Sequence, residues 1–360
     1  MGNPIALSSR DFSVRGEGVD NPQRLLLGHF DAAFVVVYLL PLLLIALSYN
    51  VLSGERERGT LPLLLLQHQS PAPLVARRCL VAGLFSFGLL ALLLVAGLHA
   101  TGSLASAEVG RLVAWLGVAF AYGAFWLALA VFVTSRGGSS ATNAVVLASA
   151  WLLVTIVAPA VINVIAKRVY PAPSRMDFIV AQRAATDEIS HRRSALLAAY
   201  FEDHPELAPE AAKRNAPDPQ VVAQMSYQET ERRLAPIRAR FAEQLARQQA
   251  LIEQLRFVSP ALLAQTAFND LTGTGLASYE TYRTQIGAHH DALRAYFQPK
   301  ILAKEKFAKY DEVPRFAFVD EPTHAVLARA AWPLGALLAI SALIVVRSIR
   351  SLRRSSPALA

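Results

Sequence analysis

The chain has 360 residues, 54% of them hydrophobic, and a mean hydropathy of +0.34. Soluble domains contain about 45–50% apolar residues, so an ordinary soluble protein is excluded and a membrane protein is expected. The net charge of +8 does not indicate a nucleic-acid-binding patch, because residues 167–324 hold 21 Lys and Arg against 20 Asp and Glu and are close to neutral. The single cysteine, Cys79, excludes a disulfide framework.

Five apolar windows follow a polar N-terminal segment, residues 1–29, which contains no stretch typical of a signal peptide. The first four windows are free of Asp, Glu, Lys and Arg over 21, 21, 23 and 26 residues, and a helix needs about 20 residues to cross the hydrocarbon core. The fifth has 17 residues and reaches full length only if Arg329 extends its side chain to the interface. The windows are Ala32–Leu52, Cys79–His99, Leu112–Thr134, Ala141–Ala166 and Ala330–Val346.

Arginine-rich segments predict the orientation, because short loops rich in Lys and Arg stay on the cytoplasmic side. Three segments have this character: the loop 53–78, the loop that contains Arg136, and the tail 347–360. If the windows alternate in direction, all three are cytoplasmic, while residues 1–29 and 167–323 lie outside. With an odd number of spans and an outside start, either the polar N-terminal segment is translocated as a short tail or a helix that normally precedes residue 1 is missing. The second alternative, an N-terminally truncated chain, is favoured.

The long segment between the fourth and fifth windows is predicted to be helical. From Leu234 to Leu255 apolar residues recur at gaps of 3, 4 and 7, which is typical of one helix face. Further helices are expected from about Arg175 to Phe201 and from about Tyr279 to Tyr310, the latter interrupted near Pro299. No alternation typical of strands occurs. The predicted fold is therefore all-α, a polytopic membrane helix bundle of about five spans with an extracytoplasmic helical domain.

The polar residues of this segment do not predict a catalytic or metal site. His289 and His290 could suggest a metal, but adjacent side chains on a helix point about 100° apart, so a solvated helix face is favoured. The mixed-sign run that includes Glu229, Arg232 and Arg233 is interpreted in the same way.

Catalytic motifs are also missing from the chain as a whole. The sequence contains no phosphate-binding loop, no H-E-x-x-H and no G-x-S-x-G, and no charged residue lies in the middle of a window. The chain is predicted not to be an enzyme and to need no metal or other cofactor. Energy for any work across the membrane would come from a partner.

A charged step follows the first window, and the stretch from Glu55 to Leu61 reads ERERGTL. Residues 63–66 are four leucines, too few to span, so they are expected to lie along the inner interface, within reach of a soluble protein. Gly59 permits a sharp bend and Thr60 can cap the segment that follows. The acidic residues of the step offer charged contacts to a basic groove.

This step resembles the E-x-E-x-G-T-L signature of type-2 ABC-transporter permeases, which also lies between two spans. The long helical insert before the last window, with SPALL at 259–263 and NDLTGTGL at 269–276, is similar to that of a bacterial subfamily of these permeases.

The resemblance implies a permease subunit of an export complex in the bacterial inner (cytoplasmic) membrane. Such a subunit pairs with a second permease, as a homodimer or a heterodimer, is surrounded by membrane lipid and binds no nucleic acid. It docks onto separate ATP-binding-cassette ATPase subunits, which hydrolyse the ATP. By the same resemblance, the ATPase-coupling residues are Glu55, Arg56, Glu57, Arg58, Gly59, Thr60 and Leu61.

Two other functions stay open. A membrane-anchored scaffold or interaction protein would use the extracytoplasmic helical domain as its working part, and an intramembrane hydrolase would need a serine and a histidine at one depth. The predicted division of the chain is an extracytoplasmic N-terminal segment 1–29, a four-helix transmembrane region 30–166 with the cytoplasmic coupling loop 53–78, an extracytoplasmic helical domain 167–323, a last transmembrane helix 324–346 and a basic cytoplasmic tail 347–360.

Overall fold

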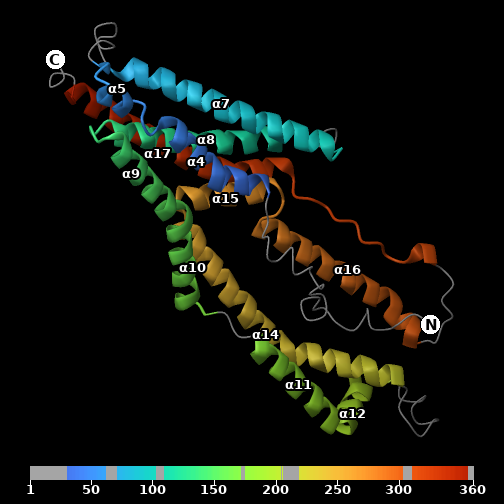
Figure 1. The fold of residues 1–360 in the computed structure, drawn as a ribbon. Helices are drawn as coiled ribbons and strands as arrows, with labels where there is room; N and C mark the ends of the chain where they lie inside the picture. Colours follow the sequence, from blue (N-terminus) through green and yellow to red (C-terminus); the bar gives the residue numbers. More distant parts are fainter. Residues whose placement is uncertain are drawn as a thin grey trace. The chain divides into compact units, whose positions relative to one another are not determined.

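The computed structural model describes residues 31–61, 71–102, 109–171, 175–203, 205, 219–302 and 310–355. Helices form the regular structure in these ranges, which contain no strand, so the predicted all-α fold is confirmed (Figure 1). Contacts divide the described chain into two units. The spanning unit comprises residues 31–163, 253–281 and 319–355, and the helical unit comprises residues 164–252 and 282–318. The predicted N-terminal segment 1–29 and the four leucines at 63–66 lie outside the described residues.

Among the described residues, five helices are long and apolar enough to cross a membrane, which makes the chain a multi-pass membrane protein. They contain the five predicted windows and extend beyond each at one or both ends. The first span, Ala32–Glu57, consists of α3 (Ala32–Phe34), η2 (Val35–Leu39), α4 (Leu40–Ser48) and α5 (Ser53–Glu57). The second and third are α7 (Pro71–Ala100) and α8 (Val109–Thr134). The fourth, Ser140–Val169, consists of α9 (Ser140–Leu152), η3 (Leu153–Val157) and α10 (Ala158–Val169), and the fifth is Thr323–Ser351 of α17 (Thr323–Ser355).

The third span, α8, is the centre of the spanning unit, and it packs against the other four spans. Its side chains Val118, Tyr122 and Trp126 are fully buried. The rings of Tyr122 and Trp126 meet edge to face, with centroids 6.2 Å apart, a favoured arrangement for aromatic pairs. Burial of these large side chains fixes α8 among its neighbours.

The fifth span begins earlier than its apolar window, because the charge of Arg329 is neutralised inside the chain. The Arg329 guanidinium binds the carboxylate of Glu321. Arg111, at the start of α8, binds Asp320 at 3.0 Å and donates to the backbone carbonyl of Glu321 at 3.0 Å. Pairing reduces the cost of a charge near the end of a span. Helix α17 therefore begins at Thr323 and includes Arg329.

Two π-turns interrupt the spans, η2 in the first and η3 in the fourth. In a π-turn the backbone hydrogen bonds shift by one residue, so that a side chain of a neighbouring helix can donate a hydrogen bond to a backbone carbonyl of the turn. In the first span, Tyr122 Oη donates to the carbonyl of Val37 at 3.1 Å, and Trp151 Nε1 donates to that of Tyr38 at 3.2 Å. The π-turn of the first span is thus tied to the third and fourth spans.

A short helix that the sequence did not predict, α15 (Pro260–Leu271), belongs to the spanning unit. It packs against α8, α17 and η3, and the ring of Phe268 lies 4.6 Å from that of Trp115. Ser259 caps α15 by accepting from the Leu262 N–H at 3.3 Å, and its Oγ donates to the carbonyl of Val154 in η3 at 2.8 Å. Contacts therefore divide the chain more finely than the predicted domain 167–323, since residues 253–281 pack with the spans.

The helical unit contains α11 (Arg175–His191), α12 (Arg193–Asp203), most of α14 (Pro219–Leu255) and most of α16 (Leu276–Leu302). The prediction of a single helix from about Arg175 to Phe201 is wrong, because a turn at Arg192 divides this segment into α11 and α12. The predicted interruption near Pro299 is also wrong, because α16 continues through that residue. On α14, the predicted apolar face is buried at Leu234 but exposed at Leu245.

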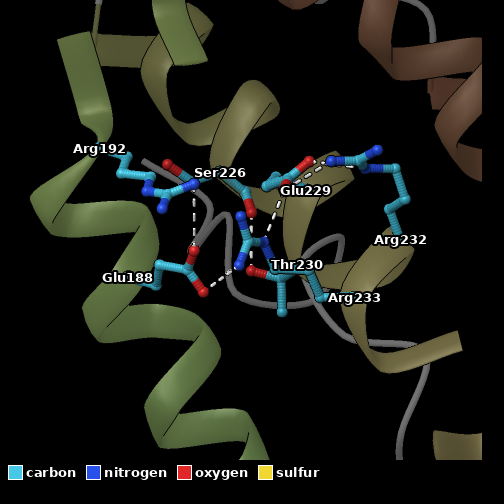
Figure 2. A network of polar contacts seen from close by, with 7 residues as sticks. All are labelled: Glu188, Arg192, Ser226, Glu229, Thr230, Arg232 and Arg233. Carbon is cyan, nitrogen blue, oxygen red and sulfur yellow. Dashed lines mark hydrogen bonds and ion pairs between the residues drawn. The ribbon is translucent and has the colours of Figure 1, made fainter. Parts of the chain in front are cut away.

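Ion pairs join α11 to α14 within the helical unit (Figure 2). Arg233 on α14 binds Glu188 on α11 and, on its own helix, binds Glu229 through Nε at 2.6 Å. Arg232 binds the same Glu229 carboxylate at 2.9 Å, and Arg192 binds Glu188 at 3.5 Å. The predicted solvated face is therefore wrong for Glu229, which is buried against its two arginines.

The two histidines of α16 have different surroundings. His290 is 5% exposed, so the prediction of a solvated face is wrong for this residue. The ring of His289 lies 5.4 Å from that of Phe316. Within the described part of the chain, no group of three His, Cys, Asp or Glu side chains is placed to hold a metal ion.

Candidate functional site

The candidate site is the charged step 53–61, which joins the first span to the loop that follows. Residues Ser53–Glu57 form the short helix α5, and the chain turns at Gly59, whose φ of +72° lies in the left-handed region. The turn is closed by bonds from the Gly59 N–H to the Arg56 carbonyl, 3.1 Å, and from the Thr60 N–H to the Glu55 carbonyl, 3.0 Å. Glycine adopts this conformation without a steric cost, so the predicted bend at Gly59 is confirmed.

Glu55 connects the step to the second span. Its carboxylate accepts from Nη2 of Arg78, and the Nη1 of the same guanidinium donates to the Val51 carbonyl at 2.9 Å. The Thr60 hydroxyl also donates to the Glu55 carboxylate. The predicted cap by Thr60 concerns the segment after residue 61, which lies outside the described residues. Within them, the Thr60 hydroxyl holds the turn closed. One arginine thus fixes both α5 and the turn between α4 and α5 to α7.

Glu57 connects the step to the fourth span. Its Oε1 accepts from the backbone N–H of Ser140 at 2.6 Å, in the first turn of α9. The first N–H groups of a helix lack partners within the helix, and the helix dipole favours a negative charge there. A carboxylate from another helix therefore caps α9.

A buried polar cluster strengthens the same junction. The Ser53 and Ser140 hydroxyls are 2.9 Å apart, and Asn143 Nδ2 donates to Ser53 Oγ at 3.2 Å and to the Tyr49 carbonyl at 3.4 Å. Asn143 and Ser53 are each 1% exposed. These bonds tie both sides of the turn between α4 and α5 to the start of the fourth span.

The remaining residues of the step divide into packed and exposed positions. Leu61 is 2% exposed and packs with Val51 and Val75. The Arg56 guanidinium lies beside Gly137, so a Cβ at that glycine would be 3.3 Å from Arg56 Nη1. Arg58 is exposed and stands next to the exposed turn.

The structure therefore brings all seven predicted residues into one compact step. The carboxylates of Glu55 and Glu57 accept bonds from within the chain, and Glu57 is exposed. The predicted contact of these carboxylates with a basic groove of a partner stays a prediction. The partners Arg78, Ser140 and Asn143 were not predicted as site residues. Arg78 belongs to the arginine-rich loop 53–78, which served only to predict the orientation.

The arginine-rich segments lie at one end of the spanning unit (Figure 1). Besides the bonds of Arg78 and Glu57, the Ser351 hydroxyl near the end of α17 donates to the Ser135 carbonyl after α8 at 3.4 Å. The start of α7 and the start of α9 are thus bonded to α5, and the last turns of α17 are bonded to the segment that follows α8. We call this the arginine-rich end.

Comparison with known proteins gives one match. A family model described as a domain of unknown function (DUF3526) matches residues 175–319. This range lies between the fourth and fifth spans and covers less than half of the chain. No curated protein and no solved structure matches the chain.

Proposed function

We propose that the chain is a permease subunit of an ATP-driven export complex and that it is coupled to a separate ATPase subunit through the step 53–61. One observation carries the proposal: the step is bonded to the beginning of the second span by Arg78 and to the beginning of the fourth by Ser140 and Asn143. A force applied to α5 would act on three spans together.

The energy source follows from the composition of the spans. The five spans carry no charged residue in the middle of their apolar windows, so a proton or ion relay of the kind used by ion-driven carriers has no obvious residues. ATP hydrolysis is therefore assigned to the partner chain. The arginine-rich end is assigned to the cytoplasm, because short segments rich in arginine stay on that side. The membrane is proposed to be a bacterial inner membrane, in line with the resemblance of the step to type-2 permeases.

The exposed part of the step is the proposed contact with the ATPase. Glu55, Thr60 and Leu61 are bonded or packed within the chain, whereas Arg58 and the Gly59 turn are exposed. Charged groups at the rim of an interface govern association and partner choice. Arg58 is therefore the sharper target for a test, because its replacement leaves the internal bonds in place.

A second function is favoured by a different observation. The family match falls on residues 175–319 and on none of the first four spans. A membrane-anchored scaffold or interaction protein, whose helical unit is the working part, would carry its family-defining residues there. This alternative predicts that the step 53–61 contributes only to folding.

The two functions are separated by purifying the intact membrane complex with Arg58→Glu and measuring its ATPase activity. The permease proposal predicts loss of the ATPase activity that accompanies the unaltered chain. The matched control is Arg350→Glu. Arg350 is an exposed arginine in the last turns of α17, also at the arginine-rich end, and the variant should keep the ATPase activity. The double variant Glu55→Ala, Glu57→Ala should lose it too, because the step is released from the second and fourth spans. Retention of ATPase activity by both step variants would contradict the permease proposal, as would labelling of residue 58 from the periplasm.

A further inference from the structure

The outward face of the second span is apolar within the membrane and ends in an arginine. Helix α7 exposes Leu80, Val81 and Leu84, which are 62%, 66% and 67% exposed. Arg77 is also exposed and lies three, four and seven residues before them, so all four residues share one face of the helix. No π-turn interrupts α7, so this register holds along the whole segment. Arg77 therefore continues the surface that faces lipid.

The fifth span ends in the same way. Leu343 and Val346 of α17 are 70% and 47% exposed. Arg347 is exposed, follows Val346 directly and lies four residues after Leu343. The beginning of α7 and the end of α17 lie at the same end of the spanning unit (Figure 1), and the two helices contact each other. We call Arg77 and Arg347 the lipid-facing arginines.

The lipid-facing arginines lie at the depth of the lipid head groups. Each is within two residues of the end of its charge-free window, which corresponds to at most about 3 Å along a helix. The hydrocarbon core is about 30 Å thick and the whole bilayer about 40–45 Å, so each head-group layer is about 5–8 Å thick. Arg350 follows Arg347 about one turn later and lies farther from the hydrocarbon. An arginine so close to the core can reach a lipid phosphate while its stem touches acyl chains.

The chain itself supplies no anion for these two guanidinium groups. At the arginine-rich end, the Glu55 carboxylate is bonded to Arg78, and the Glu57 carboxylate is bonded to the backbone N–H of Ser140. Among the described residues, neither lipid-facing arginine has a carboxylate partner. Their charge is therefore available to an anion outside the chain.

The opposite end of the third and fifth spans shows the other arrangement. Arg111, at the start of α8, binds Asp320, and Arg329, near the start of α17, binds Glu321. These arginines are neutralised by carboxylates of the chain itself. The lipid-facing arginines instead carry their charge to the membrane surface, where basic side chains attract anionic lipids.

We propose that the lipid-facing arginines bind the head group of an anionic phospholipid in the leaflet at the arginine-rich end. A planar guanidinium donates two parallel hydrogen bonds to the oxygens of a phosphate, so its geometry suits this ligand. A zwitterionic lipid also has a phosphate, but its own cation would face further positive charge. A basic residue near a membrane surface increases the affinity for anionic lipid about fivefold. Two arginines without a carboxylate partner therefore select a lipid of net negative charge.

The bound lipid would lie next to the step 53–61. Arg77 directly precedes Arg78, whose guanidinium holds α5 and the turn between α4 and α5. A head group held by Arg77 fixes the beginning of α7 at the phosphate layer and so steadies the helix to which the step is bonded. The inference does not depend on the proposed function, because it involves neither an ATPase nor a transported substrate.

Native mass spectrometry of the purified full-length chain in detergent tests the proposal. The chain is titrated with phosphatidylglycerol and, separately, with phosphatidylcholine of the same acyl chains, and the bound lipids are counted. The unaltered chain should bind phosphatidylglycerol at least about fivefold more tightly. The double variant Arg77→Gln, Arg347→Gln should lose this preference. The matched control is Arg240→Gln on α14, an exposed arginine that also has no carboxylate partner among the described residues, and it should keep the preference.

Two further measurements make the result decisive. Each single replacement should weaken the binding of phosphatidylglycerol about fivefold, and these milder variants decide the question if the double variant does not fold. An excess of inorganic phosphate should not displace the lipid, because acyl-chain contacts add to its binding. The proposal is overturned if the unaltered chain binds both lipids equally, if the folded glutamine variants keep the full preference, if Arg240→Gln loses as much, or if free phosphate displaces the lipid.

Discussion

Glu229→Gln is expected to loosen the junction between α11 and α14. The Glu229 side chain is 10% exposed and accepts from Arg232 at 2.9 Å and from Arg233 at 2.6 Å, while Arg233 also binds Glu188 on α11 (Figure 2). A hydrogen bond to a charged group contributes about 1.5–3 kcal/mol, and the change leaves the Arg233 guanidinium, which is 24% exposed, with Glu188 as its carboxylate partner. Arg232 is 76% exposed, so most of the loss should come from Arg233.

Hydrogen–deuterium exchange of the full-length chain in detergent measures this loss locally. A decrease of about 1.5–3 kcal/mol corresponds to roughly 10- to 150-fold faster exchange of the amides in α11 and in α14 near residue 229. The matched control is Glu243→Gln on the same helix. Glu243 and its partner Arg247 are each 59% exposed, so this change should accelerate exchange less than about threefold. Equal acceleration by the two variants would refute the reasoning that burial makes the Glu229 pairs strong.

The same junction should weaken in acid. Hydrogen bonds from Arg232 and then Arg233 hold the pKa of Glu229 below its ordinary value, although partial burial acts in the opposite direction. The pKa of Glu229 is lower in the folded chain than in the unfolded chain, where it is about 4.3. The ionised carboxylate therefore stabilises the junction fully above about pH 4.3, and this stabilisation is lost as the pH falls through the pKa of the folded chain. Protection factors of α11 and α14, corrected for intrinsic exchange, should fall below about pH 4.3 in the unaltered chain and change less in Glu229→Gln. An unchanged acid response in the variant would assign the pH dependence to other groups.

Two further predictions concern the packing of the third span. Gly123→Ala should destabilise the chain by about 1–3 kcal/mol, because the added Cβ would collide with the ring of Phe87 on α7. The control is Gly117→Ala on the same helix, where the added Cβ meets open space. Thermal unfolding in detergent should give a lower midpoint for Gly123→Ala, and equal midpoints for the two variants would contradict the close packing. Tyr122→Phe should cost about 0.6–1.7 kcal/mol, because it removes the donor to the Val37 carbonyl at the π-turn. Exchange at the amides of η2 should rise in Tyr122→Phe, and an unaltered rate would show that the π-turn holds without this bond.

The spans could be predicted from the sequence because their signal is local. A run of about 20 residues without charge has few alternatives to a membrane helix, and five such runs are present. Their ends could not be predicted in the same way. The start of α17 depends on the pairing of Arg329 with Glu321 and on the bond from Arg111, which comes from a residue about 210 positions earlier. A hydropathy window contains no information about such a partner.

The helical unit shows a similar division between local and distant causes. The existence of α14 follows from its spacing of apolar residues, whereas the break at Arg192 carries no glycine or proline signal. The burial of His290 and Glu229 depends on neighbours that a single helix face cannot reveal. Helix α15 did carry a signal, since its buried positions recur at three and four residues and Ser259-Pro260 is a typical helix start. That signal is short, only 12 residues long, and therefore ambiguous.

The candidate site was predicted by its residues but not by its bonds. The motif from Glu55 to Leu61 could be recognised because four charged residues of alternating sign follow the first window and precede a glycine, a threonine and a leucine. Its partners Arg78 and Ser140 are 23 and 83 positions away from Glu55 and Glu57. No periodicity links such positions, so the engagement of both carboxylates within the chain could only come from the fold.

The placement of α15 with the spans changes how the protein can be cut and recombined. Between residues 163 and 319 the chain passes from one unit to the other four times, after residues 163, 252, 281 and 318. A domain carried on one loop has two connections and can be exchanged as a single cassette. Here, exchange of the whole segment 167–323 would remove a helix whose cap bonds to the fourth span and whose Phe268 packs on the third. A chimera that keeps the bundle intact must therefore be joined at four points, with α15 retained between the two replaced pieces.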